Sequence, residues 1–344
     1  MIMRLITKSI IFILIISLLS VSFCFTASAL VIYEGDFGFE VNTSTHEAAL
    51  VAYTGDGGAV VIPNDFQGYP VTVIDHNAFS GNESITEVVF AETNTTIEEY
   101  AFMKCTSLET VVIPESVVTI GDRAFADCTS LQTVTMLSDI VSMPTNMFSG
   151  CTALCELTLS ESIVDFGYGC FNGCSALTDL DFVSRGVMLD SFAFNGTGAE
   201  SVVLSDALLA IPNYAFTNCP RLTYVTIPES VVLIQPYAFD WNSVTIRCIP
   251  DSYAHIFAEE NGVPYELLEA YLLGDADGDG EVTIIDATYI QRWLVRLSLP
   301  SALDESGADT NGDGVVKITD VTYLQRWLVG IEIPYPVNSL IYKY

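Results

Sequence analysis

The chain has 344 residues, half of them hydrophobic, and a formal net charge of −31 at pH 7. This length is more than one compact domain usually needs and is enough for two or three. Its 12 lysines and arginines argue against a nucleic-acid-binding protein, because phosphate binding needs clustered basic side chains. A surface this acidic favours cations and basic or neutral partners instead.

The segment 1–29 has the pattern of a secretory signal peptide. Arg4 and Lys8 precede an apolar run at 10–19, and small side chains at 27–29 resemble a cleavage site. A retained membrane helix is the alternative, but the apolar run is shorter than the roughly 20 residues that span a bilayer. We therefore expect cleavage after Ala29, no membrane insertion of the remaining chain, and a secreted protein with a net charge of −33.

A sequence motif centred on one phenylalanine recurs eight times in the next part of the chain. The phenylalanines are Phe79, Phe102, Phe125, Phe148, Phe171, Phe194, Phe216 and Phe239. They are 23 residues apart except for one interval of 22. Repeats of this length indicate a solenoid, in which each repeat packs only against its neighbours.

Each repeat contains a polar slot and a short alternating pattern. The slot lies three residues after the phenylalanine and holds Asn82, Cys105, Cys128, Cys151, Cys174, Thr197, Cys219 and Asn242. An LxxVxI pattern follows in most copies, for example from Leu108 and from Leu131. Alternation of this kind predicts a short strand with one buried face, so the rungs should stack as a parallel sheet.

These repeats closely resemble the BspA-like (Treponema pallidum-type) leucine-rich repeats of bacterial surface proteins. The resemblance covers residues 60–248, and VVIPESVVTIGDRAFADCTSLQTV fits the family pattern almost throughout. It implies a mainly β solenoid at residues 77–268, preceded by a β entry cap at 30–76. SYAHIFAEENGVPYELL, at 252–268, resembles the helix and strand that close the other end.

Eight cysteines remain after removal of the signal peptide, and an even number in an exported protein suggests disulfides. Five of them, however, share the polar slot with asparagine and threonine. We expect that slot to need a small buried group that bonds the turn backbone, and we predict stacked free thiols. Rungs about 4.8 Å apart would permit a bridge, and the states of Cys155, Cys170 and Cys248 stay open.

The strand residues that point away from the core should form a column on one face of the solenoid. Its members are Val89, Val112, Thr135, Thr158, Asp181 and Thr226. Small β-branched residues often make nothing more than a well-formed sheet surface. If the column binds a ligand, its low charge suits an unknown protein or glycan better than a small ion.

Two similar loops, at 274–286 and 308–320, follow the repeats. The first is GDADGDGEVTIID and the second is ADTNGDGVVKITD. Positions 1, 3, 5 and 12 of the twelve-residue loops hold Asp275, Asp277, Asp279 and Asp286 in the first copy, and Asp309, Asn311, Asp313 and Asp320 in the second. Gly280 and Gly314 take position 6, where a sharp turn is needed.

This spacing is that of EF-hand calcium loops, so we predict two Ca²⁺ sites. Oxygens from alternate side chains and from the position 7 backbone carbonyl, here of Glu281 and of Val315, suit a hard cation. Position 9 is Thr283 in one loop and Lys317 in the other. Since lysine cannot ligate a cation, water should take that place in the second loop.

Each loop leads into a predicted helix, DATYIQRWLV at 286–295 and DVTYLQRWLV at 320–329, with no incoming helix expected before either loop. A loop and one helix, duplicated, resemble a type I dockerin, which we place at 269–332 with a short tail at 333–344. The resemblance implies a small all-α module that binds a cohesin module of a scaffoldin. The implied contact residues are Ile284, Ile285, Arg292, Ile318, Thr319 and Arg326.

The two helices match at eight of ten positions, so half a turn of rotation should present nearly the same surface. We hypothesise two binding orientations, biased by the difference between Ile285 and Thr319. The Ser-Thr pair common in the family is absent, which indicates a different cohesin class. Calcium should also contribute to folding, because so small a module buries little apolar surface.

The sequence argues against an enzyme. Cap, repeats, closure and dockerin leave no room for a catalytic domain, and His46-Glu47 lacks the second histidine of HExxH. We therefore expect an exported, non-catalytic cellulosome-type component, held at the cell surface through a scaffoldin, whose solenoid presents a protein- or glycan-binding surface. The alternatives are an adhesin for host, bacterial or plant-wall surfaces and a carbohydrate-binding accessory protein.

Overall fold

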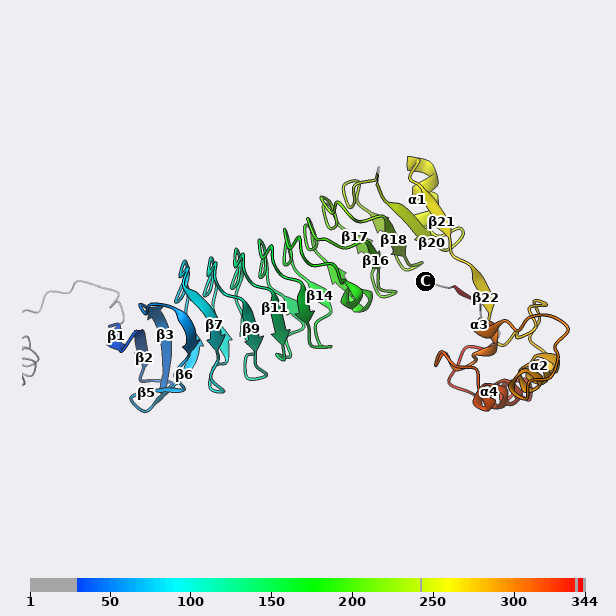
Figure 1. Cartoon of the computed structure of the whole chain (residues 1–344), viewed down its shortest axis with the longest axis horizontal. Coiled ribbons are helices and arrows are strands. Elements are labelled where there is room, and N and C mark those ends of the chain that lie inside the picture. The colour runs from blue at the N-terminus through cyan, green and yellow to red at the C-terminus, as the bar shows by residue number, and fades with distance from the viewer. Residues whose placement is uncertain (1–29, 242, 338–339, 343–344) are drawn as a thin grey trace, which may run out of the picture.

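The structure, a computed structural model, describes residues 30–241, 243–337 and 340–342. The expected signal peptide at 1–29 and the slot residue at 242 lie outside the described residues. Among the residues described, no helix is long and apolar enough to cross a membrane. Figure 1 shows a long stack of rungs that begins at an antiparallel cap and is followed by a helical module.

The cap covers the first rung with antiparallel strands. β1 (Ile32–Glu34), β2 (Phe37–Asn42) and β3 (Glu47–Tyr53) pair antiparallel, and β3 then pairs in parallel with β6 (Tyr69–Ile74). β5 (Asp65–Phe66) forms a hairpin with β6. The cap therefore joins the parallel stack through a hydrogen-bonded sheet and leaves no open edge on the first repeat.

The rungs build two rows of parallel strands. The longer row, in spatial order, is β13 (Glu156–Thr158), β11 (Thr133–Met136), β9 (Thr110–Ile113), β7 (Ile85–Val89) and β4 (Gly58–Val61). The second row consists of two-residue strands: β8 (Thr96–Ile97), β10 (Thr119–Ile120), β12 (Ser142–Met143), β14 (Asp165–Phe166), β15 (Met188–Leu189), β17 (Ala210–Ile211) and β19 (Leu233–Ile234). The predicted parallel solenoid is confirmed.

The longer row is interrupted at the repeat that begins at Phe171. A 3₁₀ helix, η1 (Asp181–Arg185), takes the place of the expected strand, and the row resumes at β16 (Ser201–Val203), β18 (Tyr224–Ile227) and β20 (Thr245–Cys248). The Asp179 carboxylate accepts the backbone N–H of Asp181, a local bond that competes with strand pairing. The turn also packs Phe182 against Phe166 and Phe194.

The predicted outward column is therefore only partly right. Val112, Thr135 and Thr158 are in register on adjacent strands, as expected. Asp181 does not belong to the column, because it starts η1. Thr226 is only 4% exposed, in register with Val203 and Arg247 on the neighbouring strands.

Two ladders of side chains run through the core. The eight repeat phenylalanines stack face to face, with centroid distances of 4.8–5.8 Å and interplanar angles of 1–20°. The slot thiols donate to the carbonyl of a phenylalanine in the preceding repeat at 3.1–3.3 Å: Cys105 to Phe79, Cys128 to Phe102, Cys151 to Phe125, Cys174 to Phe148 and Cys219 to Phe194. Most of these carbonyls also accept a backbone N–H from their own turn, so the slot thiol supplies them with a second donor from the next repeat.

The far end of the stack is closed by a helix and a strand, as expected. α1 (Tyr253–Asn261) begins at Ser252, whose hydroxyl accepts the N–H of His255, and ends at Gly262 in the left-handed region. β21 (Tyr265–Leu267) then pairs in parallel with β20. Ala254 and Ala258 of α1 join the solenoid core, so the last rung is covered by the chain itself.

The C-terminal module packs two long helices, α2 (Ile284–Leu294) and α4 (Ile318–Leu328), around a core of its own. The core contains Ala287, Ile290, Val321 and Leu324. β22 (Ala270–Leu272) and β23 (Leu340–Tyr342) pair antiparallel and join the start of the module to its end. Ile333 and Val337, which the sequence reading placed in a separate tail, also pack into this core.

Thiol reactivity tests the cysteine ladder. All eight cysteines from Cys105 to Cys248 are free, and only Cys155 is exposed. Burial raises the pKa of the Cys105, Cys170 and Cys174 thiols well above the usual range and that of Cys248 to about 11, which suppresses the reactive thiolate. We expect alkylation of the native protein at pH 8 to label Cys155 roughly a hundredfold faster than any buried cysteine.

Peptide mapping by mass spectrometry reads the labelled positions. The same reaction in denaturant is the control, in which all eight should react. Rapid native labelling of a slot cysteine, or a disulfide between two slots, would contradict the ladder.

Candidate metal loops and docking face

The first loop is organised around the side chain of Asp275. Its Oδ1 accepts the N–H groups of Gly278 and Asp279, and its Oδ2 accepts that of Gly280, at 2.8–3.1 Å. Asp286, twelfth in the loop, accepts the N–H of Ala276 at 2.8 Å. The loop thus wraps its backbone donors around the two carboxylates at its ends.

The second loop repeats this network. Asp309 accepts the N–H groups of Asp313 and Gly314, and Asp320 accepts those of Asn311 and Lys317. The side chains at positions 3 and 5 also correspond: Asp277 and Asn311 each accept the N–H of position 5, and Asp279 and Asp313 each accept that of position 7. Two segments that differ in sequence therefore fold into the same arrangement of oxygens.

Burial makes these carboxylates costly without a cation. Asp286 is 1% exposed, Asp320 is fully buried, and Asp275 is 6% exposed. One oxygen each of Asp275, Asp277 and Asp286 lies within 4.8 Å of the others. Burial, helped by the nearby Asp286 and Asp279, raises the pKa of Asp277. A group of buried oxygens with like charges suits a hard divalent cation, which would neutralise them.

The carboxylate at position 12 has a second role that the loop pattern did not suggest. Asp286 is the third residue of α2, and its Oδ2 accepts the N–H of the capping residue Thr283 at 2.7 Å. Asp320 does the same at α4 for the N–H of Lys317, at 2.8 Å. Aspartate, with its short side chain, therefore connects each loop to the first turn of the helix that follows.

The two loops differ in what surrounds them. Lys317 donates to the Asp313 carboxylate at 3.0 Å and lowers its pKa, whereas the first loop has the neutral Thr283 at the corresponding position. The second loop also has an incoming helical turn, α3 (Glu305–Ala308), capped by Asp304. The expectation of no preceding helix is thus wrong for this loop, because Asp304 caps a turn ending directly before Asp309.

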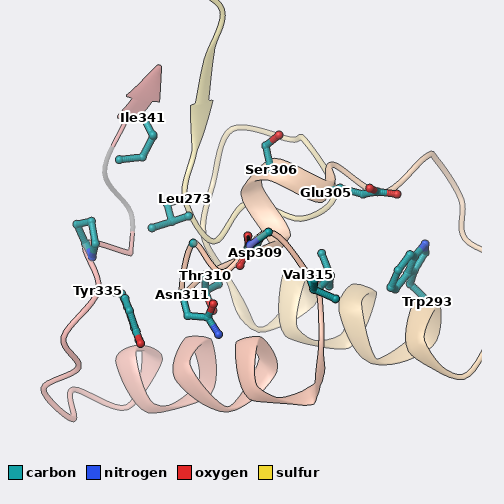
Figure 2. Close-up of a pocket in the computed structure, with 14 residues that line it drawn as sticks. Leu273, Trp293, Glu305, Ser306, Asp309, Thr310, Asn311, Val315, Tyr335 and Ile341 are labelled. Atoms are coloured by element: carbon teal, nitrogen blue, oxygen red, sulfur yellow. Dashed lines mark hydrogen bonds between the residues drawn. The ribbon is translucent and has the colours of Figure 1, made fainter. Parts of the chain in front are cut away.

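A cavity of about 550 Å³ adjoins the second loop (Figure 2). Leu273, Trp293, Val315, Tyr335 and Ile341 line its apolar part, and Asp309 and Asn311 line its polar part. Figure 2 shows that the apolar residues come from both ends of the module, from the second loop and from α2. The cavity therefore connects the second loop with the β22–β23 closure.

The predicted docking residues lie on the outer faces of the two long helices. Ile284, Ile285 and Ile318 are 59%, 56% and 62% exposed, and Thr319 and Arg326 are exposed as well. Arg292 is half-buried, and its guanidinium donates to the Ser298 carbonyl at 2.5 Å. Three isoleucines exposed at two helix starts are unusual for a surface that meets only water.

The sequence duplication extends beyond the two helices. The sequence analysis did not predict this extension. Leu299, Pro300 and Leu303 recur as Ile333, Pro334 and Val337, at the same offset that separates the two loops. Leu299, Leu303, Ile333 and Val337 pack in the module's core. An alignment of the two halves at the loop offset, continued past the helices, would reveal these equivalent residues from the sequence alone.

The solenoid exposes its own apolar row beside the second set of strands. Val118, Val141, Val187, Leu209 and Val232 are each more than 45% exposed, at corresponding positions of the repeats, and the row is interrupted between Val141 and Val187 by the half-buried Val164. An acidic residue precedes most of them by two or three positions: Glu115, Asp139, Asp206 and Glu229. The sequence did not predict this row. In adjacent apolar residues such as Val-Val or Leu-Leu, the sequence does not show which of the two is buried.

A ladder of aromatic residues lies near this row at the last repeats. Phe192, Tyr214 and Tyr237 stack face to face, with centroids 4.8 and 5.4 Å apart. The middle ring, Tyr214, has both faces against its neighbours, whereas Tyr237 ends the stack and is 60% exposed.

Comparison with known proteins identifies both parts. The model of the BspA type leucine rich repeat region matches in six copies, at residues 72–197 and 187–259, and that of the dockerin type I domain matches residues 273–329. A comparison with curated proteins gives no match.

Solved structures are similar to the repeats. A leucine rich cell surface protein from Faecalibacterium prausnitzii shares 24% identity, with 65% of this chain and 77% of that chain covered and a TM-score of 0.43. The leucine rich repeat protein of T. pallidum shares 20%, with 69% and 98% covered and a TM-score of 0.45. Because the family model spans more than half of the sequence, the chain belongs to the BspA-type leucine-rich repeat family, here joined to a type I dockerin domain.

Proposed function

We propose that this protein is a non-catalytic docking component whose calcium-loaded dockerin binds a cohesin while its solenoid presents a protein-binding surface. The observation that carries the proposal is the doubled loop, in which two different sequences place carboxylates and amide oxygens in one network. Both matched families are interaction modules, which supports a role without catalysis. An exported, cell-surface location fits both modules.

Calcium would be held by one set of oxygens in each loop. The first set is Asp275, Asp277, Asp279, Asp286 and the Glu281 carbonyl, and the second is Asp309, Asn311, Asp313, Asp320 and the Val315 carbonyl. The ion would offset the repulsion among buried carboxylates and fix the starts of α2 and α4. Since the docking isoleucines occupy positions 10 and 11 of the loops, calcium would also position the binding surface.

The cohesin face would consist of Ile284, Ile285 and Arg292 on α2 and of Ile318, Thr319 and Arg326 on α4. Exposed isoleucines supply apolar area, and the arginines supply hydrogen bonds to oxygen acceptors on the partner. The pseudo-twofold relation between the helices permits two orientations on one cohesin.

A protein fits the solenoid better than a glycan does. Sugar rings stack on exposed aromatic faces, and in the ladder of Phe192, Tyr214 and Tyr237 the stacking leaves only Tyr237, at its end, with an exposed outer face. The apolar row with acidic neighbours instead suits a partner that combines apolar and basic side chains. An adhesin role would use this same surface.

Lys317 provides a test of the calcium loops. Its ammonium bonds a carboxylate of the second loop, so it competes with the ion for Asp313. We expect Lys317→Thr, which copies the first loop, to tighten the weaker of two calcium-binding steps by about three- to tenfold, because a nearby positive charge is removed. Calorimetric titration of the metal-free chain with calcium measures both steps.

Arg296→Thr removes an equal charge outside both loops and serves as the control. Equal effects of the two substitutions, or no calcium binding by the unaltered chain, would refute this assignment of the loops.

The cohesin proposal is tested by titrating the full chain against a panel of cohesins, with calcium and then with excess chelator. We expect binding to at least one cohesin and a loss of more than a hundredfold in affinity on chelation, since the helix starts depend on the loops. Binding that persisted without calcium would show that the docking face does not depend on the calcium loops. The absence of binding across cohesins from the same organism would refute the proposal.

A further inference from the structure

A groove beside the first calcium loop breaks the pseudo-twofold symmetry of the module. Its volume is about 350 Å³, and its walls include Ile285, Thr288, Arg292, Pro300 and Ser301. Two of these, Ile285 and Arg292, belong to the docking face proposed above. The groove therefore opens on the surface that a cohesin would cover.

The second copy fills the corresponding position with an aromatic ring. Tyr335 is the counterpart of Ser301 in the duplication, and its ring lies against Tyr323 in an edge-to-face contact with centroids 4.7 Å apart. In the first copy, the hydroxyl of Tyr289, the counterpart of Tyr323, instead receives the N–H of Ser301 at 2.6 Å. A serine thus leaves space where a tyrosine occupies it.

Arg292 of the first copy and Arg326 of the second copy also differ in their surroundings. Arg292 is half-buried, with its guanidinium held by the Ser298 carbonyl at 2.5 Å. Arg326 is exposed, and among the described residues its guanidinium has no hydrogen-bond partner. A fixed side chain loses less conformational entropy on binding than a free one. The first copy therefore offers both a preformed groove and a preorganised hydrogen-bond donor.

We propose that the cohesin docks in one preferred orientation, with an apolar side chain inserted into the first-copy groove beside Ile285 and an oxygen acceptor placed on Arg292. This inference rests on the proposed function. Pro300 and Tyr289 supply apolar walls, Thr288 and Ser301 supply a polar rim, and Asp277 and Asp279 of the first calcium loop close the remaining side. In the second copy Tyr335 stands in place of Ser301, and its ring lies on Tyr323, the counterpart of the groove wall Tyr289.

Blocking the groove separates one orientation from two. If both orientations contributed equally, closing one would lower the association constant only about twofold. We expect Ser301→Tyr, which copies the second repeat, to weaken binding to the panel cohesin by more than about tenfold. Ile285→Asp, an exposed substitution in the first turn of α2, should weaken it similarly and keeps the test valid if Ser301→Tyr folds poorly.

Two control variants accompany the titration of the calcium-loaded full chain. Ala302→Tyr adds the same ring at the exposed neighbour of Ser301 outside the groove, and Tyr335→Ser opens the second copy. Both should bind within about twofold of the unaltered chain. Calcium stoichiometry and melting temperature, measured on every variant, check the fold.

The outcomes distinguish the two proposals. Loss on Ser301→Tyr and Ile285→Asp, but not in the controls, supports the single orientation. Binding within about twofold for Ser301→Tyr with an intact calcium stoichiometry overturns it and leaves the cohesin proposal standing. Failure of the unaltered chain to bind any cohesin overturns both.

Discussion

Stacking of identical positions from rung to rung is the constraint on which the rest of this molecule depends. Each repeat contributes one phenylalanine to a column with centroids about 5 Å apart, close to the spacing of hydrogen-bonded strands. No single rung can bury its phenylalanine alone, so stability comes from neighbours. The terminal rungs lack one neighbour, so each end is covered by another element: an antiparallel cap at one end, and α1 with β21 at the other.

The same constraint accounts for the thiols. Each slot side chain must be small, because it lies between two rungs, and must donate, because it faces a phenylalanine carbonyl of the previous repeat. Cysteine meets both conditions with little polar cost, whereas the Thr197 hydroxyl donates to the carbonyl of Phe194 in its own repeat. Asn82, in the first repeat, instead accepts N–H groups from its own turn. The slot composition is thus a consequence of turn bonding and needs no redox role.

Sequence was sufficient wherever a side chain's role repeats. The period of 23 predicted the solenoid, and the doubled loop predicted where the carboxylates gather. It was insufficient where one residue changes a local balance. Asp179 and Asp181 occupy positions where the repeat pattern predicts a strand, yet the segment forms η1, with the Asp181 N–H bonded to the Asp179 carboxylate. Thr226 is buried at a position that is outward-facing and partly exposed in earlier repeats, a difference that no repeat pattern encodes. The turn before Asp309 likewise depends on a single cap, Asp304.

In the docking module, sequence identity between the two copies does not by itself determine how similar their binding surfaces are. The helices are nearly identical, and on that basis two orientations are expected. What covers each helix is a separate segment, where the core positions are kept but Ser301 and Ser298 change to Tyr335 and Glu332. Core positions are kept because both halves must bury the same helix face, whereas the outer positions carry no such constraint. A duplicated module can therefore keep its fold symmetric while its binding surface becomes asymmetric, and the difference appears beside the helices rather than on them.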